Sequence, residues 1–160
     1  MEDGERGALL HFLQAQRDVV FAILVGLDDA ALTTKVLPSG WTPLGLVEHL
    51  GYAERHWFQE VLLGSADPVP WADDDHTPLN TARSRDEVFA FYRSQCARSN
   101  DIFAAHSLTT PVRSPDHDLG PDFTDLRRIV LHMIEETARH AGHLDAAREL
   151  LDGTTGLGPR

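Results

Sequence analysis

The sequence has 160 residues, 42% of them hydrophobic, and its 25 acidic and 14 basic residues give a formal net charge of −11 at pH 7. This length suffices for one domain with a sizeable core and is too short to divide into two, so we expect a single domain over residues 1–160. The acidic excess repels phosphate backbones and anionic lipid surfaces, which excludes nucleic acid and membranes as expected partners.

Other features of the sequence point to a soluble cytoplasmic protein. The single cysteine, Cys96, cannot form an intrachain disulfide, which fits a reducing compartment. The N-terminal segment MEDGERGALLHFL lacks the basic and apolar pattern of a secretory signal. No stretch approaches the roughly 18 consecutive apolar residues that a membrane span needs.

Four segments are predicted to be long helices. The first spans about Glu5 to Leu27, where apolar residues recur at helical spacing. The second begins at Thr42 and Pro43, because threonine can cap free amides and proline suits the first helical position. It continues to Gly64, since glycine is a normal signal for a helix end.

The third and fourth predicted helices lie in the second half of the chain. The third begins at SRDE, residues 84–87, which has the sequence of a capping box, and runs to about Ala105. The fourth runs from near Thr124 to about Leu151, ending before Gly153.

Two long connections rich in Pro, Asp, Ser and Thr, residues 65–83 and 106–123, separate the later helices. Connections of this length are typical of functional lids or crossovers. No segment alternates apolar and polar residues, so we predict no sheet. Four amphipathic helices with long connections indicate an all-α four-helix bundle.

The fourth helix, LRRIVLHMIEETARHAGHLDAARELLDG, carries ionisable residues inside its apolar stripe. With 100° per residue and the stripe centred near Met133, His140 lies about 20° from the centre and Glu136 about 60°. His132 and His143 flank them at about 80–100°. An unpaired carboxylate is costly to bury, so Glu136 needs a cation, a metal ion or a hydrogen-bond partner.

A third metal ligand is expected from the second helix. Its core stripe passes through Leu46, Leu50, Ala53, Trp57 and Val61. His49 lies at the margin of this stripe, and His56 lies two turns further along on nearly the same side. His49 with Glu136 and His140 gives a His2Glu set, and three protein ligands leave one position open, as in catalytic zinc sites. Packed or surface side chains would explain the same pattern, and His56 or His132 as a fourth ligand would close the site.

At these residues the sequence resembles the DinB-like superfamily. The similarity rests on WTPLGLVEHL, which begins at Trp41, and on HMIEETARHAGHLDAARELLDG in the fourth helix, and it spans essentially the whole chain. The most similar branch occurs largely in actinobacteria and is mostly of unknown function. Many members carry His-x-x-x-His in the last helix, whereas this chain has Glu136 and His140. In that respect it resembles the mycothiol-dependent maleylpyruvate isomerases.

The resemblance implies a four-helix bundle of the DinB type with long crossover connections. It also implies a divalent metal held by one histidine of the second helix and two residues of the fourth. A His2Glu set suits zinc, and nickel, manganese or iron would also accept it. Bundles of this superfamily often pair, so a homodimer is expected, although no sequence feature here demonstrates one.

We predict a metal-dependent S-transferase or isomerase that uses a low-molecular-weight thiol such as mycothiol. The open metal position would lower the pKa of the thiol, and its thiolate would attack a small electrophile. His143, Arg139 and Asp145 are candidates for acid–base work, while Cys96 is interpreted as core filling. Two alternatives remain: a metal-dependent hydrolase of small molecules, and a non-catalytic protein that the metal stabilises.

Overall fold

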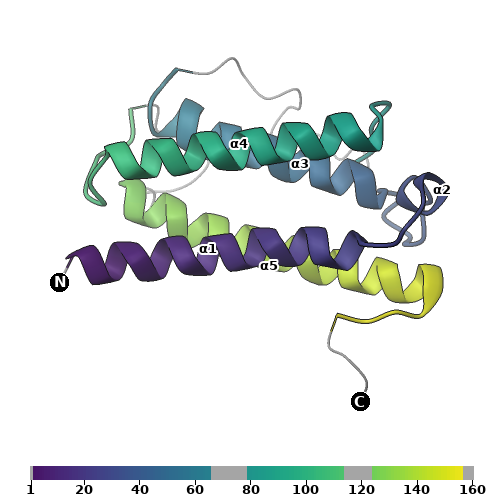
Figure 1. The fold of residues 1–160 in the computed structure, drawn as a ribbon. Coiled ribbons are helices and arrows are strands. Elements are labelled where there is room, and N and C mark those ends of the chain that lie inside the picture. The colour runs from purple at the N-terminus through teal and green to yellow at the C-terminus, as the bar shows by residue number, and fades with distance from the viewer. Residues whose placement is uncertain (1, 66–78, 114–123, 157–160) are drawn as a thin grey trace.

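The structure is a computed structural model that describes residues 2–65, 79–113 and 124–156. Its helices are α1 (Glu2–Leu24), α2 (Asp29–Leu32), α3 (Pro43–Arg55), the π-helical turn η1 (His56–Val61), α4 (Arg85–Ala105) and α5 (Leu126–Asp152). The long helices lie in two layers, with α3 and α4 in one and α1 and α5 in the other (Figure 1). Strand pairing within the described ranges is limited to an isolated bridge between Pro111 and Asp125, which confirms the all-α class.

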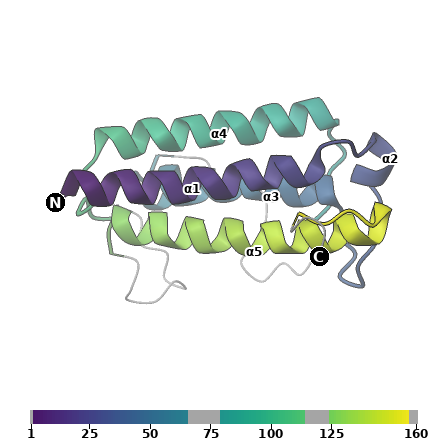
Figure 2. The ribbon, with the colours of Figure 1, turned by 60° about the horizontal axis from the view of Figure 1, so that its bottom comes forward.

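The four long helices form two parallel pairs. α1 and α5 run in the same direction, as two hydrogen bonds show. Near the N-termini of both helices Arg127 donates to Glu5, and near their C-termini Arg148 donates to the carbonyl of Ile23. α3 and α4 are also parallel (Figure 2). The pairs therefore meet in two antiparallel seams, named here the α3/α5 seam and the α1/α4 seam. This direction pattern requires the long crossover between α3 and α4 that the sequence predicts.

Capping residues place the helix ends close to the predicted positions. The hydroxyl of Thr42 accepts a hydrogen bond from the Gly45 amide at 3.1 Å, and Ser84 and Glu87 form the predicted capping box. Gly153 ends α5 with φ +77°, a conformation that glycine adopts without strain. The first helix differs, because it covers Glu2–Leu24 rather than 5–27 and is followed by a turn through Gly26 at φ +86°.

Two local elements were not predicted from the sequence. α2 is a single turn whose first amides are capped by Asp28, the acceptor of a 2.8 Å hydrogen bond from the Ala31 amide. The predicted second helix changes at His56 from α-helical to π-helical, with the Leu62 amide donating to the Trp57 carbonyl five residues earlier. Such π-turns occur frequently near functional sites.

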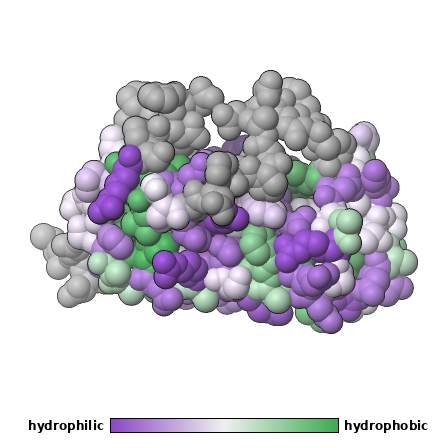
Figure 3. All heavy atoms as spheres, turned by 90° about the horizontal axis from the view of Figure 1, so that it is seen from above, coloured by the Kyte–Doolittle hydropathy of each residue, from purple (hydrophilic) through white to green (hydrophobic). Residues whose placement is uncertain are grey.

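The core consists of two apolar clusters, one toward each end of the bundle. The predicted stripe residues Leu46, Leu50, Ala53, Trp57 and Val61 are all buried. Phe12, one of the apolar residues that recur at helical spacing in the first predicted helix, is 58% exposed rather than part of the core. The face seen in Figure 3 is mostly hydrophilic, with small separate hydrophobic areas. Among the described residues, no helix is both long and apolar enough to cross a membrane.

Candidate metal centre

Three predicted ligands converge in the α3/α5 seam. His49 extends from α3, while Glu136 and His140 extend from α5 one turn apart. The Nε2 atom of His140 donates to Glu136 Oε1 at 2.9 Å, and Nε2 of His49 donates to the same oxygen at 3.4 Å. The three inward-facing atoms lie within 4.8 Å of one another, which is compact enough for one ion to reach all of them.

The triad, meaning His49, Glu136 and His140, is partly accessible to solvent. Its side chains are 20%, 20% and 15% exposed, respectively. Hydrogen bonds from His140 and His49 lower the pKa of Glu136 strongly, and they outweigh the opposing effect of burial. Glu136 is therefore an ionised carboxylate with both histidine Nε2 atoms directed at it.

Close packing of α3 against α4 fixes the position of His49. A Cβ atom on Gly51 would lie 2.7 Å from the Phe91 ring and 3.4 Å from the Tyr92 Cα atom, so a side chain at position 51 would push the helices apart. On the inner side of α3, Leu46 and Leu50 are buried. These contacts hold His49 at the margin of the core stripe, where it faces α5.

The two histidines proposed as a fourth ligand are engaged elsewhere. His56 Nδ1 donates to Glu60 at 2.9 Å. The ring of His132 lies against Trp57, with a centroid separation of 4.3 Å, and burial lowers the pKa of His132. The described residues that could hold an ion together here are His49, Glu136 and His140, which leaves the cluster at three protein ligands.

Of the three acid–base candidates, only His143 contacts the triad among the described residues. Its Nδ1 atom lies 3.4 Å from Nδ1 of His140, and its ring centroid lies 6.1 Å from that of Trp41. Arg139 pairs with Glu135 on the surface, and Asp145 accepts a hydrogen bond from the Gly156 amide. Arg139 and Asp145 thus have structural partners away from the triad.

Comparisons with known proteins identify the family. A family model described as mycothiol-S-transferase matches residues 8–153. The chain belongs to the mycothiol S-transferase family. This result confirms the DinB-like resemblance seen in the sequence.

Other comparisons support the fold alone. A solved structure described as a conserved protein of locus from Enterococcus faecalis is similar, with a TM-score of 0.67 and 13% identity over 92% of this chain and 97% of that one. No curated protein matches the sequence.

In this mycothiol S-transferase family member, the chemistry of the triad fits a divalent ion. Two imidazole nitrogens and one carboxylate oxygen are the donor types that zinc and other first-row divalent metals accept. The ionised carboxylate of Glu136 supplies a negative charge that a divalent cation would balance. The donor set does not select one metal.

Sequence reasoning missed a buried ion pair between α1 and α3. Arg17 of α1 is 1% exposed and Glu54 of α3 is fully buried, with two hydrogen bonds of 2.7 Å between them. A signal was present, because Glu54 follows Leu50 by four residues and precedes Trp57 by three, inside the core stripe of α3. Cys96 is buried, as predicted.

Proposed function

We propose that this chain is a metal-dependent S-transferase that joins the sulfur of mycothiol to a small electrophile. His49, Glu136 and His140 would hold the metal ion, for which zinc is the best match. The convergence of these three side chains in the α3/α5 seam carries the proposal. Membership of the mycothiol S-transferase family supports the choice of thiol.

The ion would supply an open coordination position that lowers the pKa of a bound thiol, so that a thiolate exists at neutral pH. The triad contributes three ligands, and its partial exposure gives a small molecule access from solvent. Zinc sites with three protein ligands are typical of catalysis, whereas closed sites with four are typical of structural roles. This favours an enzyme over a protein that the metal only stabilises.

His143 is proposed to orient His140 through their shared hydrogen bond. In the structure His140 Nε2–H donates to Glu136, so the Nδ1 atom of His140 accepts a hydrogen bond from Nδ1–H of His143. A ligand role for Nε2 would move the ring proton to Nδ1 and reverse this hydrogen bond, making His143 the acceptor. Burial and the charge of His140 lower the pKa of His143, which favours the neutral ring that an acceptor requires.

In the proposed reaction the thiol loses its proton, its sulfur forms a bond to an electrophilic carbon, and a leaving group departs with the bonding electrons. Cys96 cannot serve as the nucleophile in its place. Its side chain is buried, and burial raises the pKa of the Cys96 thiol to about 12.

The test is turnover of mycothiol with an alkylating probe such as monobromobimane by purified, metal-loaded protein. We expect thiol-dependent turnover in the wild type, its loss in His140→Ala, and its retention in Cys96→Ala. Unchanged turnover in His140→Ala would refute the mechanism. Hydrolysis of an ester probe without thiol, lost in the same variant, would instead support the hydrolase alternative.

A further inference from the structure

A layer of polar side chains crosses the middle of the bundle. Each long helix contributes one residue: Arg17 from α1, Glu54 from α3, Ser99 from α4 and Thr137 from α5, with exposures of 1%, 0%, 0% and 0%. The layer separates the two apolar clusters of the core. The hydroxyl oxygens of Ser99 and Thr137 have no hydrogen-bond partner within the part of the chain that the structure describes.

A buried ion pair is an expensive way to fill this layer. The free energy needed to remove two charges from water often exceeds the free energy of their attraction. Apolar residues of similar size would frequently give equal or greater stability. Burial is the largest single influence on Arg17 and works against its charged form, but the charge and the hydrogen bonds of Glu54, with smaller contributions from Cys96 and Tyr92, together raise the pKa of Arg17. Packing alone therefore does not account for the choice of residues.

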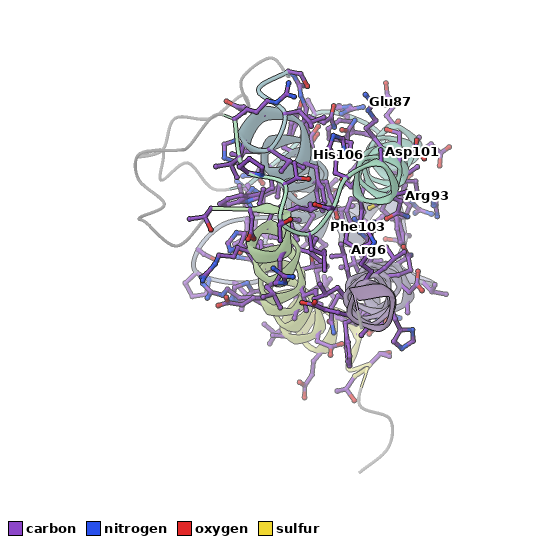
Figure 4. All side chains as sticks on the ribbon, turned by 90° about the vertical axis from the view of Figure 1, so that its left-hand side faces the viewer. Arg6, Glu87, Arg93, Asp101, Phe103 and His106 are labelled. Atoms are coloured by element: carbon purple, nitrogen blue, oxygen red, sulfur yellow. The ribbon has the colours of Figure 1, made fainter. Side chains whose placement is uncertain are left out.

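Beside the layer lies an open surface cavity of about 300 Å³ in the α1/α4 seam, at which Asp18, Arg93 and Ala97 are exposed. This size is at the lower end of the range for small-molecule sites. The lining residues used below are Arg17 and Phe21 from α1 and Arg93, Cys96, Ala97 and Asn100 from α4. In the end-on view of Figure 4, Arg93 lies on the outer side of the bundle between α4 and α1.

Two arginines supply hydrogen-bond donors to the lining of this cavity. Arg17 carries five N–H groups, and three of them have acceptors in Glu54 and Asn100. The guanidinium of Arg93 lies 4.5 Å from the centroid of the Phe21 ring, and no carboxylate among the described residues pairs with it. Asp18 also lines the cavity, and its carboxylate accepts a hydrogen bond from Gln14.

The remaining walls are apolar. The Phe21 ring packs against Phe89 and Tyr92, with centroid separations of 5.5 and 5.4 Å, and forms a rigid aromatic wall. Ala97 adds only a methyl group, and the Cys96 thiol next to it is uncharged at neutral pH. A ligand with a flat apolar body and one negatively charged end would match both the apolar lining and the arginine donors of the cavity.

We propose that the α1/α4 cavity binds a small aromatic carboxylate, whose carboxylate is held by Arg93 and the remaining N–H groups of Arg17 and whose ring lies between Phe21 and Ala97. This site is separate from the triad, which lies in the other antiparallel seam.

Benzoate is the probe, and the measurement is a titration of metal-loaded protein followed by two-dimensional 15N NMR. We expect saturable shifts concentrated in α1 and α4. Ala97→Phe fills the cavity and should abolish them, while Arg93→Gln should weaken binding about tenfold. Ala105→Phe, the same change at an exposed position of α4 outside the cavity, should bind as the wild type does.

Circular dichroism establishes whether each variant is folded. If Ala97→Phe does not fold, Arg93→Gln alone tests the site. A carboxylate could also bind a metal in the triad, so a His49→Ala/His140→Ala variant is titrated in parallel. Binding lost in that variant but kept in Ala97→Phe and Arg93→Gln would overturn the proposal. Absence of saturable binding to the wild type would overturn it as well.

Discussion

The α3/α5 seam and the buried polar layer between α1 and α3 each contain a glutamate that faces nitrogen-bearing side chains, but the charge of the glutamate is balanced differently in the two places. Glu54 is fully buried and forms two 2.7 Å hydrogen bonds with a guanidinium of this chain. Glu136 is 20% exposed and faces two imidazoles, which we propose as metal ligands. The comparison teaches that a carboxylate paired with an arginine, such as Glu54, has a structural role. A carboxylate that faces two imidazoles, such as Glu136, remains available to bind a metal ion.

The largest expected effect comes from removing Glu54, the buried partner of Arg17. Glu54→Gln would leave the Arg17 charge buried without a counter-charge and should lower the free energy of unfolding by about 3–5 kcal/mol. Urea denaturation measures this loss. The matched control is Glu135→Gln, which breaks the exposed pair with Arg139 and should cost about 0.5 kcal/mol or less.

The paired variant Arg17→Met/Glu54→Leu removes both charges and should recover most of the stability, because apolar side chains can replace a buried pair. A loss below about 1 kcal/mol in Glu54→Gln would contradict the structural role assigned to the pair.

The second largest expected effect is the loss of thermal stability when metal is removed from the triad in the α3/α5 seam. Free metal at about one hundred times its Kd stabilises a folded protein by about 2.7 kcal/mol, so adding EDTA should lower the wild-type Tm. His49→Ala should show no such response, because it lacks one of the three ligands. His56→Ala, on the same helical segment but paired with Glu60, should respond as the wild type does. Equal responses in both variants would exclude the triad as the site.

A smaller effect, on metal affinity, is expected from replacing His143, the histidine that contacts His140. His143→Gln should weaken metal binding by about tenfold, because a partner that orients a metal ligand typically contributes 10–100-fold to affinity. Chelator competition measures the change. His132→Gln, at the same helix but packed against Trp57, is the control. Similar losses in both variants would argue against the proposed role of His143.

The pH dependence of the metal-free protein is the smallest effect. The pKa of Glu136 is lowered by folding, so its contribution to stability is complete above the unfolded value of about 4.3 and is lost as the pH falls below it. We expect the wild type to exceed Glu136→Gln by about 1 kcal/mol at pH 7, with the difference shrinking below about pH 4. Urea denaturation at each pH tests this, and a difference that does not shrink below about pH 4 would contradict it.

Much of this architecture could be predicted because its determinants are local. Thr42, Ser84 and Gly153 each define a helix end through contacts within a few residues. The spacing of Glu136 and His140 on one helix face was also readable from the sequence. That His49 lies opposite them came from a family resemblance and from helix periodicity together.

What could not be predicted depends on contacts between distant segments. Arg17 and Glu54 are 37 residues apart, and periodicity places each on an inner face without showing that they meet. In the π-helical turn at His56–Val61 the Leu62 amide donates to the Trp57 carbonyl five residues earlier, a local change in hydrogen bonding that helical periodicity does not show. The outward position of Phe12 likewise depends on which side of α1 packs against α5.

The central claim is that the α3/α5 seam holds a metal ion, and elemental analysis tests it most directly. Wild-type protein and a His49→Ala/His140→Ala variant are purified without an affinity tag or added metal, and their metal content is compared. We predict near-stoichiometric divalent metal in the wild type and none in the variant. Equal metal content in both, or none in either, would contradict the claim.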